Sequence, residues 1–206
     1  MVEMMTVIAI IGIVSAMALV AWYNEMPIIR ADSAMELLQA QIRQARETAV
    51  DLRRTIQVTF SGTGTVTTVE QLVNVTTTPP TVTGTQTLTT FAIDPNQMTF
   101  AILAGVPDTL DKFGNTTASP GYCVASSGIC LGSGTCGAPA ALPCTINFQA
   151  DGTVVNSSGN YFNGTIFLAT VGNAANPANP LTARAVTILG STGRIKGYRY
   201  NGSTWF

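Results

Sequence analysis

The chain has 206 residues, with an apolar fraction of 46% and a charged fraction of 10%. Charged residues make up about 25% of an ordinary soluble domain, so the surface of this protein depends on neutral polar groups. The net charge is −1, which excludes a whole-chain field that would select nucleic acid or an anionic membrane. Histidine is absent, and this excludes Ser-His-Asp and Cys-His catalytic arrangements and histidine-based zinc sites.

The N-terminal segment is long and apolar. From Met4 to Asn24 no charged residue occurs, and about 20 apolar residues in a helix span a bilayer core. A cleaved secretory signal is the alternative, but such a signal begins with a basic region, whereas this chain has Glu3 there. The segment therefore predicts a hydrophobic transmembrane or filament-core helix over residues 1–26.

The helix is expected to continue as an amphipathic segment over residues 27–54. Pro27 removes one backbone donor, and this predicts a kink rather than an end. Beyond it, apolar residues recur at steps of three and four, as on one face of a helix: Ala31, Ala34, Met35, Leu38, Ile42, Ala45, Ala49 and Leu52. The second half is thus expected to pack on a domain, while the first half needs lipid or other helices around it.

After residue 54 the pattern changes to that of strands, and residues 55–206 are expected to form a globular domain. Runs rich in Thr, Val and Ile occur at Thr55–Phe60, Thr65–Val75, Leu88–Ile93, Met98–Leu103, Thr145–Gln149, Thr153–Val155, Tyr161–Thr170, Arg184–Leu189 and Arg194–Tyr200. Asp151-Gly152 and Gly190–Gly193 predict hairpin turns, and Val75–Thr90 predicts an exposed loop or a glycosylated patch. The predicted fold class is α+β, with one antiparallel sheet packed on the second half of the helix.

Four cysteines lie in a loop, rich in Gly, Ser and Pro, that is expected at 120–146: Cys123, Cys130, Cys136 and Cys144. Their spacings lack the short knuckles of structural zinc sites. An even number in such a stretch favours disulfides formed in an oxidising compartment over free thiols or a metal site. Of the three possible pairings, Cys123–Cys130 with Cys136–Cys144 is preferred because it closes local loops.

No catalytic, cofactor or metal site is predicted, and the chain is not expected to be an enzyme. The one candidate binding face lies in the C-terminal strand, because every charge after Asp151 is positive. One strand face would carry Arg194, Lys196, Tyr198 and Tyr200. The candidate DNA-binding set is Arg194, Lys196, Tyr198 and Arg199, since cations hold phosphates and aromatic rings stack on bases. The solvated face of a terminal strand is the plainer alternative.

The N-terminal residues resemble those of type IV pilins and pseudopilins. The run Val2-Glu3-Met4-Met5-Thr6-Val7-Ile8-Ala9-Ile10-Ile11-Gly12-Ile13 is similar to the mature N-terminus of that family, including its acidic residue and its glycine. Four later segments resemble the FimT/GspH-type branch: Gln44–Val50, Thr55–Phe60, Ala185–Ile188 and Gly193–Ile195. The basic leader, the cleavage-site glycine and the Phe-Thr pair of the family are absent. Met1 stands about where the third residue of the family's mature sequence lies. A misassigned gene start or a trimmed chain explains this difference.

The resemblance implies a type IV pilin-like fold, with a long kinked N-terminal helix whose C-terminal half packs on the sheet. It also implies a bacterial subunit that is held in the inner membrane, processed by a prepilin peptidase, methylated, and drawn by the pilus assembly machinery into an extracellular helical filament of many copies. Glu3, Gly12 and Pro27 are then the assembly residues, and Glu3 pairs with the N-terminal amine of a neighbouring subunit. A minor pseudopilin of a type II secretion system and a DNA-uptake pilus component are the alternatives.

Overall fold

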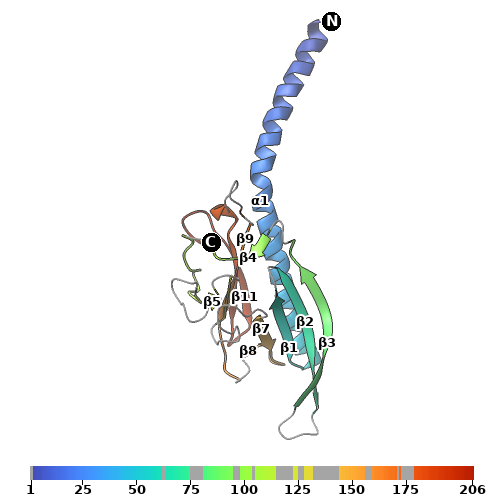
Figure 1. Cartoon of the computed structure of the whole chain (residues 1–206), viewed down its shortest axis with the longest axis vertical. Coiled ribbons are helices and arrows are strands. Elements are labelled where there is room, and N and C mark those ends of the chain that lie inside the picture. The colour runs from blue at the N-terminus through green and yellow to red at the C-terminus, as the bar shows by residue number, and fades with distance from the viewer. Residues whose placement is uncertain are drawn as a thin grey trace.

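In a computed structural model of the chain, one long helix extends from a domain built of strands (Figure 1). The structure describes residues 2–61, 64–74, 81–94, 98–103, 105–114, 123–124, 128–131, 144–155, 159–170, 172 and 179–206. Helix α1 runs from Val2 to Leu52 and continues through Pro27, as predicted. The N-terminus lies at the far end of α1, and the domain packs along the second half of this helix (Figure 1).

The strands form two antiparallel sheets. The first has the order β3-β2-β1-β7-β8, and its strands are β1 (Ile56–Ser61), β2 (Thr65–Asn74), β3 (Thr81–Ala92), β7 (Cys144–Phe148) and β8 (Val154–Val155). The second has the order β11-β10-β9-β6-β5, with β4 also paired to β9. Its strands are β4 (Met98–Phe100), β5 (Cys123–Val124), β6 (Ile129–Leu131), β9 (Gly164–Thr170), β10 (Arg184–Leu189) and β11 (Arg194–Arg199). A short 3-10 helix, η1 (Pro180–Thr182), precedes β10.

The predicted α+β fold with one antiparallel sheet on the helix is wrong, because the strands divide into two sheets and strands are the main structure after α1. The chain changes sheet before β4, before β7 and before β9. Membership of a sheet depends on long-range pairs, such as Val58 opposite Ile146, and the alternation within one strand does not encode its partner. The pilin-like fold with a single sheet that the resemblance implied is corrected for the same reason.

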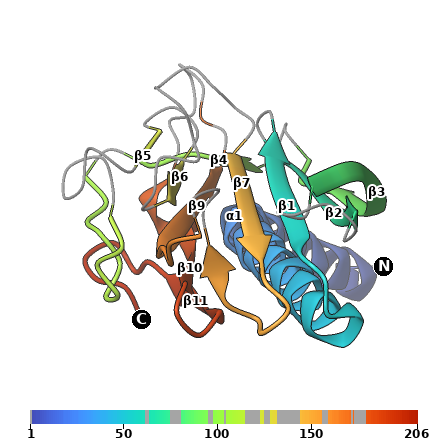
Figure 2. The ribbon, with the colours of Figure 1, turned by 90° about the horizontal axis from the view of Figure 1, so that it is seen from below.

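The second half of α1 packs against both sheets. Figure 2 shows β9, β10 and β11 on one side of α1 and β1 with β7 on the other. The buried residues of α1 recur at alternating steps of four and three: Ala31, Met35, Leu38, Ile42, Ala45 and Ala49. They join one hydrophobic core with inward side chains of both sheets. Of the remaining residues of the predicted stripe, Ala34 is partly buried against this core, whereas Leu52 is exposed.

Two hairpin turns meet beside α1. Gly152 lies between β7 and β8 with φ +80°, and Gly193 lies between β10 and β11 with φ +62°. A Cβ on Gly193 would lie 1.9 Å from the carbonyl oxygen of Gly152, so only glycine fits this contact. The hydroxyl and the N–H of Thr153 donate to Asp151 at 2.6 and 2.9 Å, and these bonds lower the pKa of Asp151. Both turns lie where the sequence predicted them.

Part of the predicted loop Val75–Thr90 is strand. Residues 81–90 belong to β3, which pairs with β2 over its whole length, while 75–80 lie outside the described residues. Threonine favours extended backbone, so the composition that suggested a loop also suits an exposed edge strand. The two short strands β5 and β6 were not predicted, because glycines and cysteines around them masked any alternation.

The outer face of the second sheet is also covered. Every residue of β9 except Thr170 is buried, although α1 covers only one side. On the other side Trp205 packs against Phe167, with ring centroids 6.0 Å apart, and its Nε1 donates to the carbonyl oxygen of Pro107 at 2.8 Å. This second core takes up aromatic residues near the C-terminus, including Tyr198 and Tyr200.

Candidate assembly surface and basic pocket

The first half of α1 stands clear of the domain (Figure 1). It exposes apolar side chains around its whole circumference. Between Glu3 and Leu19 every residue is exposed. Ten large apolar side chains here have exposed fractions from 53 to 74%: Met4, Met5, Val7, Ile8, Ile10, Ile11, Ile13, Val14, Met17 and Leu19. A helix that is hydrophobic all round is normally buried, and an apolar surface of this extent marks an interaction site. We call residues 3–19 the exposed segment.

Two of the predicted assembly residues lie within this exposed segment. Glu3 is the only charged residue among residues 1–24, and its side chain has no hydrogen-bond or ion-pair partner in the described part of the chain. Its position in the first turn of α1 is favoured by the helix dipole. A Cβ on Gly12 would meet no atom within 4 Å, yet glycine costs a helix interior about 1 kcal/mol relative to alanine. Contacts within one copy therefore give no reason for a glycine at this position.

Three of the four cysteines lie in described strands: Cys144 begins β7, and Cys123 and Cys130 lie in the β5–β6 pair. Cys130 and Cys144 are disulfide-bonded and buried. In the backbone register, Cys123 lies opposite Cys130. Cys136 and the side chain of Cys123 lie outside the described residues, so the pairing stays a prediction.

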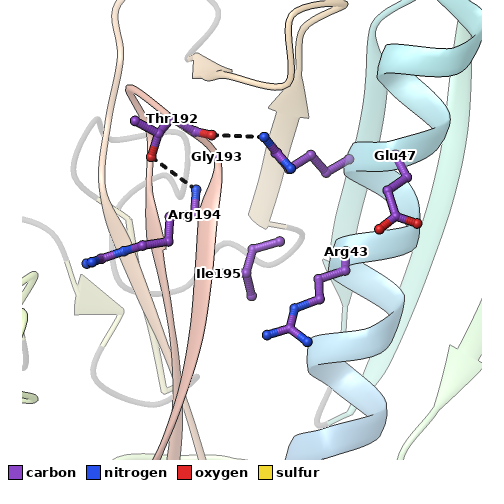
Figure 3. A pocket seen from close by; sticks show the side chains of 7 residues that line it. Arg43, Glu47, Thr192, Gly193, Arg194 and Ile195 are labelled. Carbon is purple, nitrogen blue, oxygen red and sulfur yellow. Dashed lines mark hydrogen bonds between the residues drawn. The ribbon is translucent and has the colours of Figure 1, made fainter.

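A basic pocket of about 410 Å³ lies between α1 and the β10–β11 turn (Figure 3). Arg46 donates to the carbonyl oxygens of Gly152 and Thr192, at 3.2 Å each, so this guanidinium ties α1 to both hairpin turns. Arg194 points away from Arg43 in Figure 3 and binds Asp111 at 3.1 Å. Arg46 therefore holds the helix, and Arg194 a loop, onto the sheet, which is a structural role.

The candidate DNA-binding set on β11 is largely engaged within the chain. Arg199 pairs with Asp32 at 3.1 Å and with Glu36 at 3.2 Å, and Arg194 pairs with Asp111. Tyr198 is 1% exposed and lies under Lys196, whose Nζ is 4.3 Å from the ring centroid. The strand thus presents paired cations and no exposed ring at Tyr198 on which a base could stack.

Sequence reasoning missed the acidic residues that bind the C-terminal arginines. Arg184 is buried and donates to Asp32 at 2.6 Å and to the carbonyl oxygens of Leu181 and Ala183. Asp32 and Glu36 lie four residues apart on α1, which places them on one helix face. This spacing indicates a positively charged partner for the two carboxylates, but it does not identify which arginine pairs with them.

No helix within the described ranges is both long and apolar enough to cross a membrane. The same residues contain no cluster of three or more His, Cys, Asp or Glu side chains suited to a metal ion. Comparison with models of protein families, with curated proteins and with solved structures finds no match to this chain.

Proposed function

We propose that this chain is a structural subunit of a bacterial type IV pilus-like surface filament, which assembles through the exposed segment of α1. One observation carries the proposal: residues 3–19 expose apolar side chains on all sides, while the continuation of the same helix is fixed in a folded domain. A partner that covers one face of this segment would leave the others in water. Several copies packed side by side cover all of them.

The free energy of burying the exposed segment is of the same size as the cost of assembly. Fully burying a side chain of the size of Leu or Ile contributes about 1.5–3 kcal/mol. The ten large apolar side chains of the segment are a little over half to about three-quarters exposed. Their burial supplies on the order of 10 kcal/mol, which is comparable with the cost of about 4–15 kcal/mol for fixing one molecule against others.

The attachment of the domain suits a filament with helices at its centre. Six buried residues of α1 and the ion pairs of Asp32 with Arg184 and Arg199 hold the domain against the second half of the helix. When the exposed segments gather, every domain is therefore carried outward at the same angle. The domain would form the outer surface of the filament.

A substitution at the centre of the exposed segment tests the proposal. Ile11→Asp would bury a carboxylate among apolar helices, which costs several kcal/mol, so filaments in material sheared from the producing cells should disappear. Leu110→Asp is the matched control, because Leu110 is 62% exposed on the domain and Ile11 is 59% exposed on the helix. Filaments of normal number and length from the Ile11→Asp variant would refute the proposal.

The inner-membrane stage before assembly, processing by a prepilin peptidase and methylation stay predictions. Fractionation of cells that cannot assemble filaments tests the first, and the mass of the N-terminal peptide tests the others. The abundance of the chain separates a major subunit from a minor pseudopilin, since a major subunit dominates sheared surface material.

A further inference from the structure

Strand β3 is an open edge of the first sheet. It has 12 residues, Thr81–Ala92, and among the described strands it pairs with β2 alone. None of the side chains of residues 82–92 is buried, so no described element covers the strand. Figures 1 and 2 show β3 on the flank of the domain that is remote from β11. We call the unpaired side of β3 the free edge.

The free edge lacks most of the features that protect the edges of natural sheets. Such an edge displays unpaired main-chain N–H and C=O groups, to which another strand can add. Charged side chains, proline, a short strand or a covering element usually prevent this addition. Strand β3 is long and contains no charged residue and no proline, and bulges are its one protective feature. Its main-chain groups are therefore available to a further strand.

The other edges formed by the described strands are short or protected. Strands β4, β5 and β8 have three, two and two residues. Strand β11 carries Arg194, Lys196 and Arg199, and its end is closed because Arg199 and Phe206 exchange backbone hydrogen bonds at 3.1 and 3.0 Å. Among these edges, the one uncharged partner of matching length for β3 is therefore β3 of a second copy.

The hydrogen bonds of β2 show which groups of β3 face the free edge. The N–H of Gln71 donates toward the residue before β1, at 3.1 Å. Main-chain groups alternate in direction along a strand, so those of Leu72 face β3, where Leu72 lies opposite Gly84. The groups of Gly84 therefore face β2. By the same alternation, the N–H and C=O groups of Thr85 and Thr87 face the free edge.

An antiparallel pair of two free edges fits these directions. When Gln86 lies opposite Gln86 of the second copy, Thr85 lies opposite Thr87 of the second copy, and Thr87 opposite its Thr85. Residues whose main-chain groups face each other in this way exchange both of their hydrogen bonds. The register brings no charged side chains of β3 together, because the strand has none.

The bulges of β3 agree with the same register. The pairing of β3 with β2 skips Thr83 and Leu88, so a bulge lies on each side of Gln86. In the antiparallel pair, Leu88 of one copy lies opposite Gly84 of the other, next to the bulge at Thr83. A bulge bends its strand, and here each bend meets a bend of the second copy. The bulges thus select a self-pairing register rather than prevent it.

We infer that two copies of the chain pair through the free edges of β3, antiparallel and about a twofold axis at Gln86. The contact is closed, because each edge satisfies the other. Strand β3 runs alongside the second half of α1 (Figure 1), so the two paired copies point in opposite directions.

The direction of the pair determines what it joins. In the filament proposed above all copies point the same way, so the pair does not form within one filament. It joins two filaments that lie side by side and run in opposite directions, and repetition along both makes weak contacts act together. This last step rests on the proposed function, whereas the pair itself does not.

One added cysteine at the axis tests the pair. The described residues include no free cysteine. In Gln86→Cys the two copies of the new side chain lie opposite each other, at a Cα separation of about 4.5 Å that a disulfide can span. After mild oxidation, full-length chain from sheared filaments and from detergent extracts of cells should therefore run as a dimer without reductant.

Thr90→Cys is the matched control. Thr90 is exposed on the same strand, but in this register its counterpart lies about eight residues away along the pair, or about 27 Å. The Thr90→Cys chain should stay monomeric. Equal dimer yields for the two variants, or no dimer from Gln86→Cys, would overturn the inference.

A proline tests whether main-chain hydrogen bonds hold the pair. Thr87→Pro removes an N–H that faces the free edge and leaves the bonds to β2 in place, so the domain should stay folded. Added to Gln86→Cys, it should lower the dimer yield about tenfold, since each copy loses a donor. Thr87→Val keeps the N–H and should leave the yield unchanged. The unfolding temperature checks that both variants are folded.

Electron microscopy separates this inference from the proposed function. Sheared filaments of the unchanged chain should lie in side-by-side pairs, and those of Thr87→Pro should be single. Filaments of normal yield that give no Gln86→Cys dimer would overturn the pair and leave the filament intact. Dimers in detergent extracts of cells that form no filaments would support the pair and refute the proposed function.

Discussion

Arg184 shows how a single buried charge fixes the helix to the domain. Its side chain is 3% exposed, and a buried guanidinium requires acceptors on several sides. Asp32 supplies a carboxylate from α1, while Leu181 and Ala183 supply carbonyl oxygens beside η1. The ion pair thus joins two segments that are 152 residues apart in sequence.

Removing the carboxylate of Asp32 should destabilise the domain. Asp32→Ala leaves Arg184 with carbonyl oxygens alone, and we expect the free energy of unfolding to fall by about 2–3 kcal/mol, since breaking a buried pair is costly and Asp32 is itself partly exposed. Glu36→Ala is the control, because Glu36 is 65% exposed where it meets Arg199, and it should cost about 0.5 kcal/mol or less. Urea unfolding measures both. Equal losses for the two variants would contradict this account.

Asp108 is a second residue whose surroundings change its ionisation. Burial raises the pKa of Asp108, although the N–H groups of Thr109 and Gly114 and the charge of Lys112 act in the opposite direction. Thr109 and Gly114 donate to its two oxygens at 2.7 and 3.0 Å. The folded protein therefore holds the proton of this carboxyl to a higher pH than the unfolded chain does.

The pH dependence of unfolding should reveal this proton. As the pH rises from about 4, the ordinary pKa of aspartate, through the raised folded value, the wild type should lose stability relative to Asp108→Asn, which cannot ionise. Asp151→Asn is the control, and its effect on stability should have the opposite pH dependence. The pKa of Asp151 is lowered, so the wild type should lose stability relative to that variant as the pH falls below about 4. Unfolding temperatures measured from pH 3 to 7 test both slopes, and parallel profiles for all three proteins would refute them.

At the scale of elements, α1 has two halves with different surroundings. The steps of four and three that bring Leu38 and its equivalents into the core leave Leu37 on the surface, where it is 45% exposed. Neighbouring leucines on one helix therefore have different tasks. Leu38 holds the domain, and Leu37 would contact another copy in the filament that we propose.

Alanine substitution should separate these tasks. Leu38 is 0% exposed, so Leu38→Ala should lower the free energy of unfolding by about 2–5 kcal/mol. Leu37 is 45% exposed, so Leu37→Ala should cost about 0.5 kcal/mol or less and should reduce the yield of filaments instead. Thermal unfolding and sheared yield, measured on both variants, test this division. A Leu37→Ala variant that is unstable but assembles normally would reverse the assignment.

The elements were more predictable than their arrangement. The helix, the β10 bounds and the turns at Gly152 and Gly193 follow from local patterns, namely helical spacing, alternation and residues that tolerate positive φ. The division into two sheets does not, because it depends on pairs between strands far apart in the chain. The alternation of residues around Val58 would be the same whether β1 paired with β7 or with another strand.

At the scale of the whole molecule, the candidate site was likewise predictable only where it depends on local sequence patterns. The exposure of Glu3 and Gly12 followed from the apolar run around them. The sequence also placed Arg199 and Tyr198 on one candidate DNA-binding strand, but it could not show that Asp32 neutralises the first or that the second core buries the other. The sequence of a basic strand does not show which residues will contact it. Here the contacting residues come from α1 and from the C-terminal aromatic residues.

The whole molecule is a domain fixed to one half of a helix whose other half stands clear of it (Figure 1), and the side chains of that other half are largely apolar and exposed; from this arrangement we propose a filament subunit. The most direct test of this account is mass spectrometry of filaments sheared from the producing cells, combined with electron microscopy of the same material. We predict that this chain dominates the filaments, with the exposed segments packed along their axis. A chain that is abundant and folded in the cells but absent from the sheared filaments would contradict the account.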